Sequence, residues 1–326
     1  PPSNSVGGSV RESSAYEERS HAMEKKQTKP VPYDIKVIES GHVKELYYYG
    51  ETRFRGYERS ESYGANIGKV YVSDVDKETG ELIQREATEA EAEAIKEAQK
   101  MSSREKSNVR ARNNVRRLAL SNFSNRSRFL TLTFRENIQD VELANKTFKR
   151  FIKYMNEDLR KEEKKLKYLA VIEFQKRGAI HYHMICEGIP FKKKGYRNHV
   201  RDRWRQAIRS VTGAEGEGVG NIDLKRLDTL KDVDNLGAYV VKYMTKADAD
   251  KRLFGKKLYQ TSRGLERPKE KTYRVESEAE LEKLMKELGF DDKKIVFRSQ
   301  YTDQFTLAPV NYFEVNPERR TQKSYE

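Results

Sequence analysis

Cysteine is almost absent from this chain of 326 residues, which contains only Cys186. A single cysteine cannot form a disulfide within the chain, and it excludes a zinc site built from several thiolates. Such cysteine usage is typical of a reducing compartment. We therefore expect a cytoplasmic protein.

Long apolar stretches are also missing from the sequence. No run approaches the ~20 residues that a membrane-spanning helix needs, and the N-terminus lacks the apolar core of a signal peptide. The sequence therefore predicts a soluble protein without a membrane partner. It also contains no G-x-x-x-x-G-K-S/T phosphate loop, so we expect no fused helicase.

Charged residues are plentiful, and basic ones prevail. The 65 Lys and Arg residues exceed the 51 Asp and Glu residues, which gives a formal net charge of +14. A basic balance favours a polyanionic partner, and nucleic acid comes before membrane because no amphipathic anchor is evident. The length allows one large domain or two smaller ones.

Residue composition divides the chain into four parts. Residues 1–30 are polar and Ser-rich, and we expect them to be disordered. Residues 31–100 contain short β-like pieces and the start of a helix, which indicates an accessory segment. Residues 101–315 form the main domain, which begins with a basic helix, and residues 316–326 form a loose tail.

The pattern of apolar residues predicts the elements of the main domain. Strands are expected at 129–134, 169–174, 179–185 and 221–226, and helices at 88–121, 140–159, 198–211 and 233–246. Outside this set, short strands are expected at 34–38, 45–49, 69–73, 295–298 and 301–307, and a helix at 278–288. This order implies an α+β fold, with helices packed on an antiparallel sheet. Asp140 and Ser277 are placed to cap two of the helices, and Glu280 would complete a capping box with Ser277.

A predicted hairpin at the centre of the main domain carries two histidines. His181 and His183 are two residues apart in a strand, so their side chains share one face of the sheet. A three-residue loop that ends at a left-handed Gly178 would connect this strand to the one before it. That loop length pairs Glu173 with His181 and Val171 with His183, whereas a loop one residue longer or shorter would put Glu173 on the other face.

Glu173, His181 and His183 are the donor set that a divalent ion of the Mg, Mn or Zn type prefers. Three ligands on an open sheet would leave coordination positions for a substrate. The alternative is that His-Tyr-His is ordinary strand composition and that Glu173 lies on a solvated face. The predicted register favours the metal site.

The segment YVVKYMTK, residues 239–246, predicts a helix with chemistry on one side. Tyr239 and Tyr243 lie one turn apart, and so do Lys242 and Lys246. A tyrosine near a metal-polarised phosphate can form a covalent intermediate, and a lysine can favour the phenolate or neutralise charge on the phosphate. A separate apolar stripe can hold this helix on the sheet: Leu236, Val240 and Met244.

Two clusters of basic residues are predicted to contact DNA phosphates, although such clusters can also be solvated faces. One lies on the helix before the first strand of the main domain. The other includes residues just before the helix at 198–211 and residues within that helix. Their members are Arg110, Arg112, Arg116, Arg117, Lys192, Lys193, Lys194, Arg197, Arg201 and Arg205. Aromatic and arginine residues also interleave at 47–57, where they either stack on bases or form the core of a small β-meander.

The motifs, in this order, resemble those of a known superfamily. Phe129–Phe134 (FLTLTF), then Glu173 with His181-Tyr-His183, then the tyrosine helix resemble the three motifs of rolling-circle replication initiators of the HUH endonuclease superfamily. The tandem YVVKYMTK is similar to the two-tyrosine helix of the replication A proteins of small isometric single-stranded-DNA phages. Leu258–Pro268 resembles replication proteins of filamentous phages and of related Gram-positive plasmids and integrative elements. The resemblance covers residues 104–268.

This resemblance implies a central sheet of about five antiparallel strands and a site-specific, ATP-independent nickase. Glu173, His181 and His183 would bind Mg²⁺ or Mn²⁺. Tyr243 would attack first, because some single-tyrosine relatives have a glutamate at the position of Tyr239. Tyr239 would attack second, after a round of synthesis. Lys242 and Lys246 would be electrostatic partners, whereas His21, His42 and His199 lie outside the motifs.

The implied product is a 5′-phosphotyrosine with a free 3′-hydroxyl. The implied partners are single-stranded DNA, double-stranded origin DNA, and a host helicase and polymerase; no oligomeric state is predicted. The alternatives are a transposase of the same superfamily, or a non-catalytic protein of origin recognition or copy control. A conjugative relaxase would usually place its tyrosine before the histidines, and an unrelated metal hydrolase would leave the basic helices unexplained.

Overall fold

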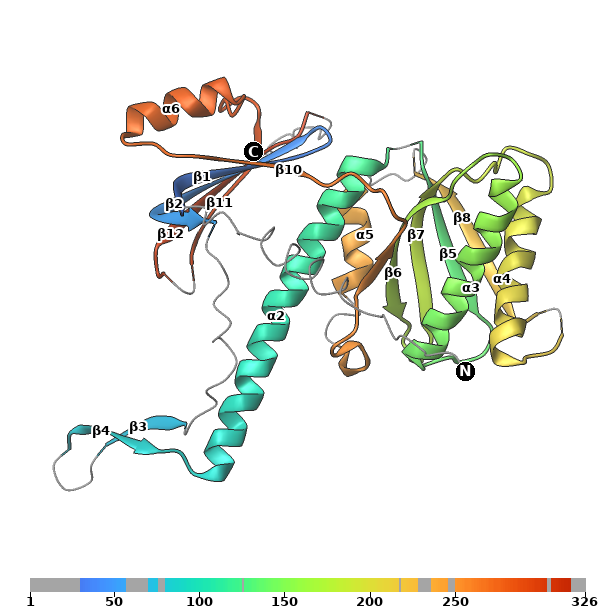
Figure 1. Cartoon of the computed structure of the whole chain (residues 1–326), viewed down its shortest axis with the longest axis horizontal. Coiled ribbons are helices and arrows are strands. Elements are labelled where there is room, and N and C mark those ends of the chain that lie inside the picture. The colour runs from blue at the N-terminus through green and yellow to red at the C-terminus, as the bar shows by residue number, and fades with distance from the viewer. Residues whose placement is uncertain are drawn as a thin grey trace, which may run out of the picture.

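The computed structural model describes residues 30–56, 70–75, 80–124, 126–216, 218–227, 236–245, 250–303 and 306–317. In this part of the chain, the strands form two five-stranded sheets and a separate hairpin. Figure 1 shows the two sheets on either side of the long helix α2, Glu89–Asn122. The predicted α+β fold with a five-stranded antiparallel sheet is confirmed. None of the described helices is long and apolar enough to cross a membrane.

The sheet that carries the histidines, called the site sheet below, is antiparallel throughout. Helices α3 (Val141–Arg160) and α4 (Tyr196–Thr212) cover one of its faces, and α5 (Leu236–Thr245) covers part of the other (Figure 1). Its strands, in spatial order, are β8 (Gly220–Arg226), β5 (Arg128–Phe134), β7 (Ile180–Glu187), β6 (Lys167–Phe174) and β9 (Tyr259–Thr261).

Strand alternation gives the site sheet an apolar core on each face. Leu132 and Tyr182 point toward α3 and α4, where Tyr182 stacks on Phe148 with ring centres 4.5 Å apart. Phe129 and Ile185 point the other way and pack in one cluster with residues of α2 and α5. The histidines belong to this second face, because they alternate with Tyr182 along β7.

Side-chain caps begin the helices largely as expected. Asp140 accepts hydrogen bonds from two backbone N–H groups of α3, as predicted. Thr88 forms a complete capping box with Glu91 at the start of α2. Ser277 caps α6 (Glu278–Glu287), but the predicted box is incomplete, because the Glu280 carboxylate accepts from the backbone of Glu276 instead of Ser277.

The second five-stranded sheet, called the distal sheet below, contains strands from the start and from the end of the described chain. Helix α6 covers one face of it (Figure 1). Its strands, in spatial order, are β10 (Lys269–Tyr273), β1 (Val31–Ser40), β2 (Val43–Arg55), β12 (Pro309–Val315) and β11 (Ile295–Thr302). A separate hairpin of β3 (Tyr71–Val75) and β4 (Leu82–Glu86) precedes α2.

The distal sheet contains strands from both sides of the domain boundary expected at residue 100. That boundary separates β1 from its partner β10 and β2 from its partner β12. Periodicity indicates each strand, but it carries no information about a partner from the opposite end of the chain. The expected disorder at residues 1–30 and the loose tail at residues 316–326 fall almost wholly outside the described residues.

Buried ion pairs attach α2 to the distal sheet. Arg116 Nη1 lies 3.0 Å from Glu45 Oε1, and Arg116 Nη2 lies 2.6 Å from Glu314 Oε2. Arg117 Nε lies 2.7 Å from Glu45 Oε2, and Arg117 Nη2 donates to the Tyr47 hydroxyl. Burial raises the pKa of the Glu45 carboxyl, whereas Arg117 and Arg116 lower it. The lowering by the two arginines is together the larger effect, so the pKa is below its ordinary value. The guanidinium groups of Arg116 and Arg117, expected to contact DNA, are thus occupied within the chain.

Glu45→Gln should separate the distal sheet from α2. Glutamine keeps the shape of the side chain but leaves two partly buried guanidinium groups with less compensating charge. We expect the free energy of unfolding to fall by about 3–5 kcal/mol, measured in urea through hydrogen exchange at β2 and β12. Asp292→Asn is the matched control, because Asp292 pairs with Arg298 while 86% exposed, and it should change stability little. Equal effects of the two substitutions would contradict this role of Glu45.

Candidate active site

The β6–β7 hairpin has the predicted register. Glu173 pairs with His181, and Val171 pairs with His183. The turn closes through a hydrogen bond of 2.7 Å from Gly178 N to Gln175 O, and Gly178 has a φ of 85°. A left-handed residue at this position favours glycine, because other side chains are strained there. The loop length therefore places the carboxylate and both imidazoles on one face.

The segment before α3 holds this turn in place. Asn137 Nδ2 and Gln139 Nε2 both donate to the carbonyl oxygen of Arg177, at 3.1 and 3.3 Å. A Cβ atom at Gly178 would lie 3.0 Å from the side chain of Gln139. A larger residue would therefore strain both the backbone and this contact.

Glu173, His181 and His183 form a compact donor set. One ligand atom from each residue lies within 4.8 Å of the others. His183 Nε2 is 2.5 Å from Glu173 Oε2. Both histidines are buried, and Glu173 is partly exposed. Two imidazoles and one carboxylate at this separation fit a small divalent ion.

The environment of His181 keeps this imidazole neutral. Burial lowers its pKa to about 4, helped by the charges of His183 and Arg177 and opposed by that of Glu173. A neutral imidazole has a nitrogen lone pair available at pH 7, as a metal ligand requires. The site is therefore prepared for a cation before one binds.

Thr131 on β5 orients His183. The two residues are cross-strand partners, and Thr131 Oγ1 lies 3.1 Å from His183 Nδ1. With Nδ1 donating its proton to this hydroxyl, Nε2 has a lone pair available for a cation bound between His183 and Glu173. The role of Thr131 could not be predicted from the sequence, because only the pairing of β5 with β7 places it beside His183.

Helix α5 brings both tyrosines to the same face. The Tyr243 ring stacks on His183 with centres 3.9 Å apart, and the Tyr239 ring packs edge-on against Phe129 at 5.0 Å. The Tyr243 hydroxyl donates to the Tyr239 hydroxyl over 3.2 Å. The predicted apolar stripe is buried and holds this orientation: Leu236, Val240 and Met244.

The surroundings of Tyr243 hold its phenol in the protonated form. Burial raises its pKa, and so do the Tyr239 hydroxyl and the charges of Glu173 and Asp223. The Lys242 ammonium lies 4.1 Å from the centre of the Tyr239 ring and 5.2 Å from that of Tyr243. Lys242 is thus close to both tyrosines, whereas Lys246 lies outside the described residues.

The expected DNA contacts fall on two sides of the site sheet. Arg110 and Arg112 belong to α2, which packs against α5 on the side of the histidines. The second cluster belongs to α4 and the loop before it, on the opposite face from the histidines (Figure 1). The structure therefore does not bring that cluster to the metal donors. Its members are Lys192, Lys193, Lys194, Arg197, Arg201 and Arg205.

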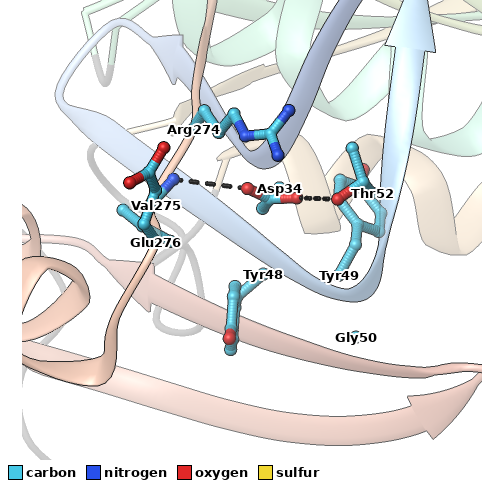
Figure 2. A pocket seen from close by; sticks show the side chains of 8 residues that line it. All are labelled: Asp34, Tyr48, Tyr49, Gly50, Thr52, Arg274, Val275 and Glu276. Carbon is cyan, nitrogen blue, oxygen red and sulfur yellow. Dashed lines mark hydrogen bonds between the residues drawn. The ribbon is translucent and has the colours of Figure 1, made fainter.

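An open pocket of about 360 Å³ lies on the distal sheet, away from these residues (Figure 2). Asp34 points into it and accepts hydrogen bonds from Thr52 Oγ1 at 2.6 Å and from Val275 N at 3.3 Å. Both carboxylate oxygens thus connect β1, β2 and the segment after β10. The pocket contains neither the metal donors nor Tyr239 and Tyr243, so the candidate active site is the one on the site sheet.

Thr131→Val should weaken metal binding. Without the hydroxyl, His183 loses the group that fixes its ring, and we expect a 10–100-fold loss of Mn²⁺ affinity by isothermal titration. Thr131→Ser should retain the affinity. Thr133→Val is the matched control, since Thr133 lies on the same strand but donates to the carbonyl oxygen of Asn221. Unchanged affinity in Thr131→Val would show that this hydrogen bond does not orient His183.

The segment that carries the metal donors and both tyrosines is similar to known proteins. Residues 127–248 match a family model described as replication-associated protein ORF2/G2P. Searches among curated proteins and among solved structures gave no significant match. The matched residues run from the start of β5 to just beyond α5, and they include the three metal donors and both tyrosines. The segment that forms the candidate active site is therefore similar to replication-associated proteins, which supports a role in replication.

Proposed function

We propose that this protein is a rolling-circle DNA replication initiator of the HUH type, which nicks and rejoins one DNA strand through a covalent phosphotyrosine. The observation that carries the proposal is the stacking of Tyr243 on His183. It puts a tyrosine directly beside a donor set for a divalent ion. The similarity of residues 127–248 to replication-associated proteins supports the same function.

Glu173, His181 and His183 would hold Mg²⁺ or Mn²⁺. The mixed nitrogen and oxygen donors suit Mn²⁺ well and accommodate Mg²⁺. When bound, such an ion stabilises negative charge on the scissile phosphate and orients it for attack. Thr131 would keep His183 turned toward such an ion, and burial keeps His181 in its neutral form.

Tyr243 would act as the first nucleophile. Its phenolic oxygen forms a bond to phosphorus while the bond from phosphorus to the 3′ oxygen breaks. The phenol loses its proton, and the departing 3′ oxygen gains one. The phosphodiester energy is retained in the tyrosyl 5′-phosphate, so rejoining requires no ATP. Lys242 is close enough to both rings to stabilise negative charge near either tyrosine.

Tyr239 would act as the second nucleophile. Its hydroxyl is 3.2 Å from that of Tyr243, so both oxygens can approach one phosphate region in turn. A second attack after one round of synthesis would release a closed single-stranded circle. The free 3′-hydroxyl at the nick would serve a host polymerase, and a host helicase would unwind the duplex.

The basic residues of α4 would contact duplex DNA outside the scissile strand. They lie on the face of the site sheet opposite the metal donors. The DNA strand that would be cleaved at the active site would therefore not contact them directly. Arg110 and Arg112 on α2 are on the active-site side and would contact the origin DNA nearer the nick. Arg116 and Arg117 are excluded from this surface because they pair with Glu45.

Covalent capture would identify the nucleophile. We expect wild-type protein mixed with single-stranded DNA and Mn²⁺ to form an adduct that survives denaturing gels and maps to Tyr243 by mass spectrometry. Tyr243→Phe should abolish this first adduct, because its ring is the one on His183, whereas Tyr239→Phe should retain it. The reverse result would exchange the two roles. Absence of any adduct on DNA from the protein's own genetic neighbourhood, with metal bound, would leave a non-catalytic origin-binding protein.

Removal of a metal ligand should abolish both binding and cleavage. We expect His181→Ala to lose more Mn²⁺ affinity than the 10–100-fold typical of outer-shell partners, and to lose the adduct as well. His199→Ala is the matched control, because His199 pairs with Asp158 between α3 and α4, away from the donor set. Full metal-dependent activity in His181→Ala would contradict the proposed site.

A further inference from the structure

The distal sheet carries a cluster of aromatic rings on the face opposite α6, called the aromatic face below. Three strands contribute to it: β2, β12 and β11. The aliphatic side chains of the sheet are concentrated on the other face, where they pack under α6. The rings of the aromatic face are those of Tyr47, Tyr49, Tyr312, Phe297 and Tyr301.

Strand pairing brings these rings together from distant parts of the chain. Tyr47 pairs with Tyr312, which in turn pairs with Ser299, between Phe297 and Tyr301 on the edge strand. The ring centres of Tyr47 and Tyr312 are 5.0 Å apart, and those of Phe297 and Tyr312 are 6.0 Å apart. Alternation along β2 places Tyr48 on the other face. The aromatic face is thus a different set from the run of aromatic residues visible in the sequence.

The outer rings are unusually open for their type. Phe297 is 47% exposed and Tyr301 is 46% exposed, although both belong to a regular strand. Burial raises the pKa of Tyr47, Tyr49, Tyr301 and Tyr312, so their hydroxyls are neutral at physiological pH. Phe297 and Tyr301 therefore present flat, uncharged rings to solvent, whereas Tyr47, Tyr49 and Tyr312 beside them are partly buried.

The charges around the rings are balanced. Arg53 lies with its guanidinium carbon 4.0 Å from the centre of the Tyr49 ring and pairs with Asp303 at 2.6 Å. The carboxylates of Glu45 and Glu314 are neutralised by Arg116 and Arg117, as described above. The aromatic face thus presents no uncompensated carboxylate from these residues to repel a polyanion, and the chain as a whole has a net charge of +14.

We propose that the aromatic face binds single-stranded DNA by stacking bases on the exposed rings of Phe297 and Tyr301. Open aromatic rings on the edge strand of a sheet form a general platform for unpaired bases. Helix α2 contacts the same face at Glu45, Glu314 and Tyr47, which belong to β2 and β12. Duplex DNA fits less well, because its bases are already stacked on each other. This inference rests on the proposed function, which produces single-stranded DNA at the origin.

Helix α2 links the distal sheet to the candidate active site. The C-terminal part of α2 is joined to the distal sheet through Glu45 and packs in the same cluster as α5 on the site sheet. A strand bound at the aromatic face would therefore be held by the same helix that supports the tyrosines. Such binding would keep unpaired DNA near the active site and would oppose its reannealing.

Leucine substitutions would separate stacking from general apolar contact. The probe is a short fluorescein-labelled oligo(dT), titrated with the full chain and followed by anisotropy. We expect Phe297→Leu combined with Tyr301→Leu to weaken binding at least fivefold for each ring lost, since stacking contributes about 1 kcal/mol or more per base. Phe297→Trp should retain the affinity. Tyr71→Leu is the matched control, because Tyr71 is an exposed aromatic residue on the separate β3–β4 hairpin.

Photocross-linking of the wild-type protein to iodouracil-containing single strands gives an independent readout that requires no variant. We expect cross-links on β11 or β12 in addition to any at the tyrosine helix. Unchanged oligo(dT) affinity in the double-leucine variant together with no cross-link on these strands would overturn the proposal. So would a change of oligomeric state in that variant with DNA affinity retained, which would make the aromatic face a protein interface.

The outcome is separable from that of the proposed function. Covalent capture with Tyr243 reports nicking, and it does not involve β11. An adduct with unchanged oligo(dT) affinity in the double-leucine variant would retain the nickase and remove the platform. Weaker oligo(dT) binding in that variant, without any adduct from the wild type, would retain the platform and remove the nickase.

Discussion

The register of the β6–β7 hairpin is the constraint on which the candidate active site depends. A three-residue loop that ends at a left-handed Gly178 pairs Glu173 with His181, and strand alternation then puts His183 on the same face. A shift of one residue would move the carboxylate to the opposite face, under α3 and α4. The hydrogen bonds from Asn137 and Gln139 to the turn resist such a shift, because they hold it against the segment before α3.

The other parts of the site are positioned relative to this hairpin by packing. β5 lies beside β7, so its alternating residues present Thr131 to His183 and Phe129 to the tyrosine rings. Helix α5 buries its apolar stripe against the same face. Because Tyr239 and Tyr243 are one helical turn apart, both project toward the histidines. Chemistry and packing thus overlap on one short helix, because both tyrosine rings also pack in the cluster of the apolar stripe.

Helix α2 connects this site to a second body of the molecule. Its basic C-terminal half was expected to track a phosphate backbone, yet Arg116 and Arg117 pair with buried carboxylates of the distal sheet. A buried charge pair is costly to break because each partner would be left without compensation. The same network neutralises the acidic groups of the aromatic face. A structural role for the two arginines is therefore compatible with DNA binding by the sheet that they hold.

The sequence by itself determined the local features: the strand alternation, the turn at Gly178, the face shared by His181 and His183, and the tyrosine spacing, since each follows from backbone geometry over a few residues. It could not place Thr131 beside His183, nor β1 beside β10 and β2 beside β12, because strand pairing between distant segments leaves no periodic signal. It also could not distinguish a basic residue that contacts DNA from one that forms a buried ion pair. Only tertiary structure decided those questions, because burial and partners depend on which surfaces meet.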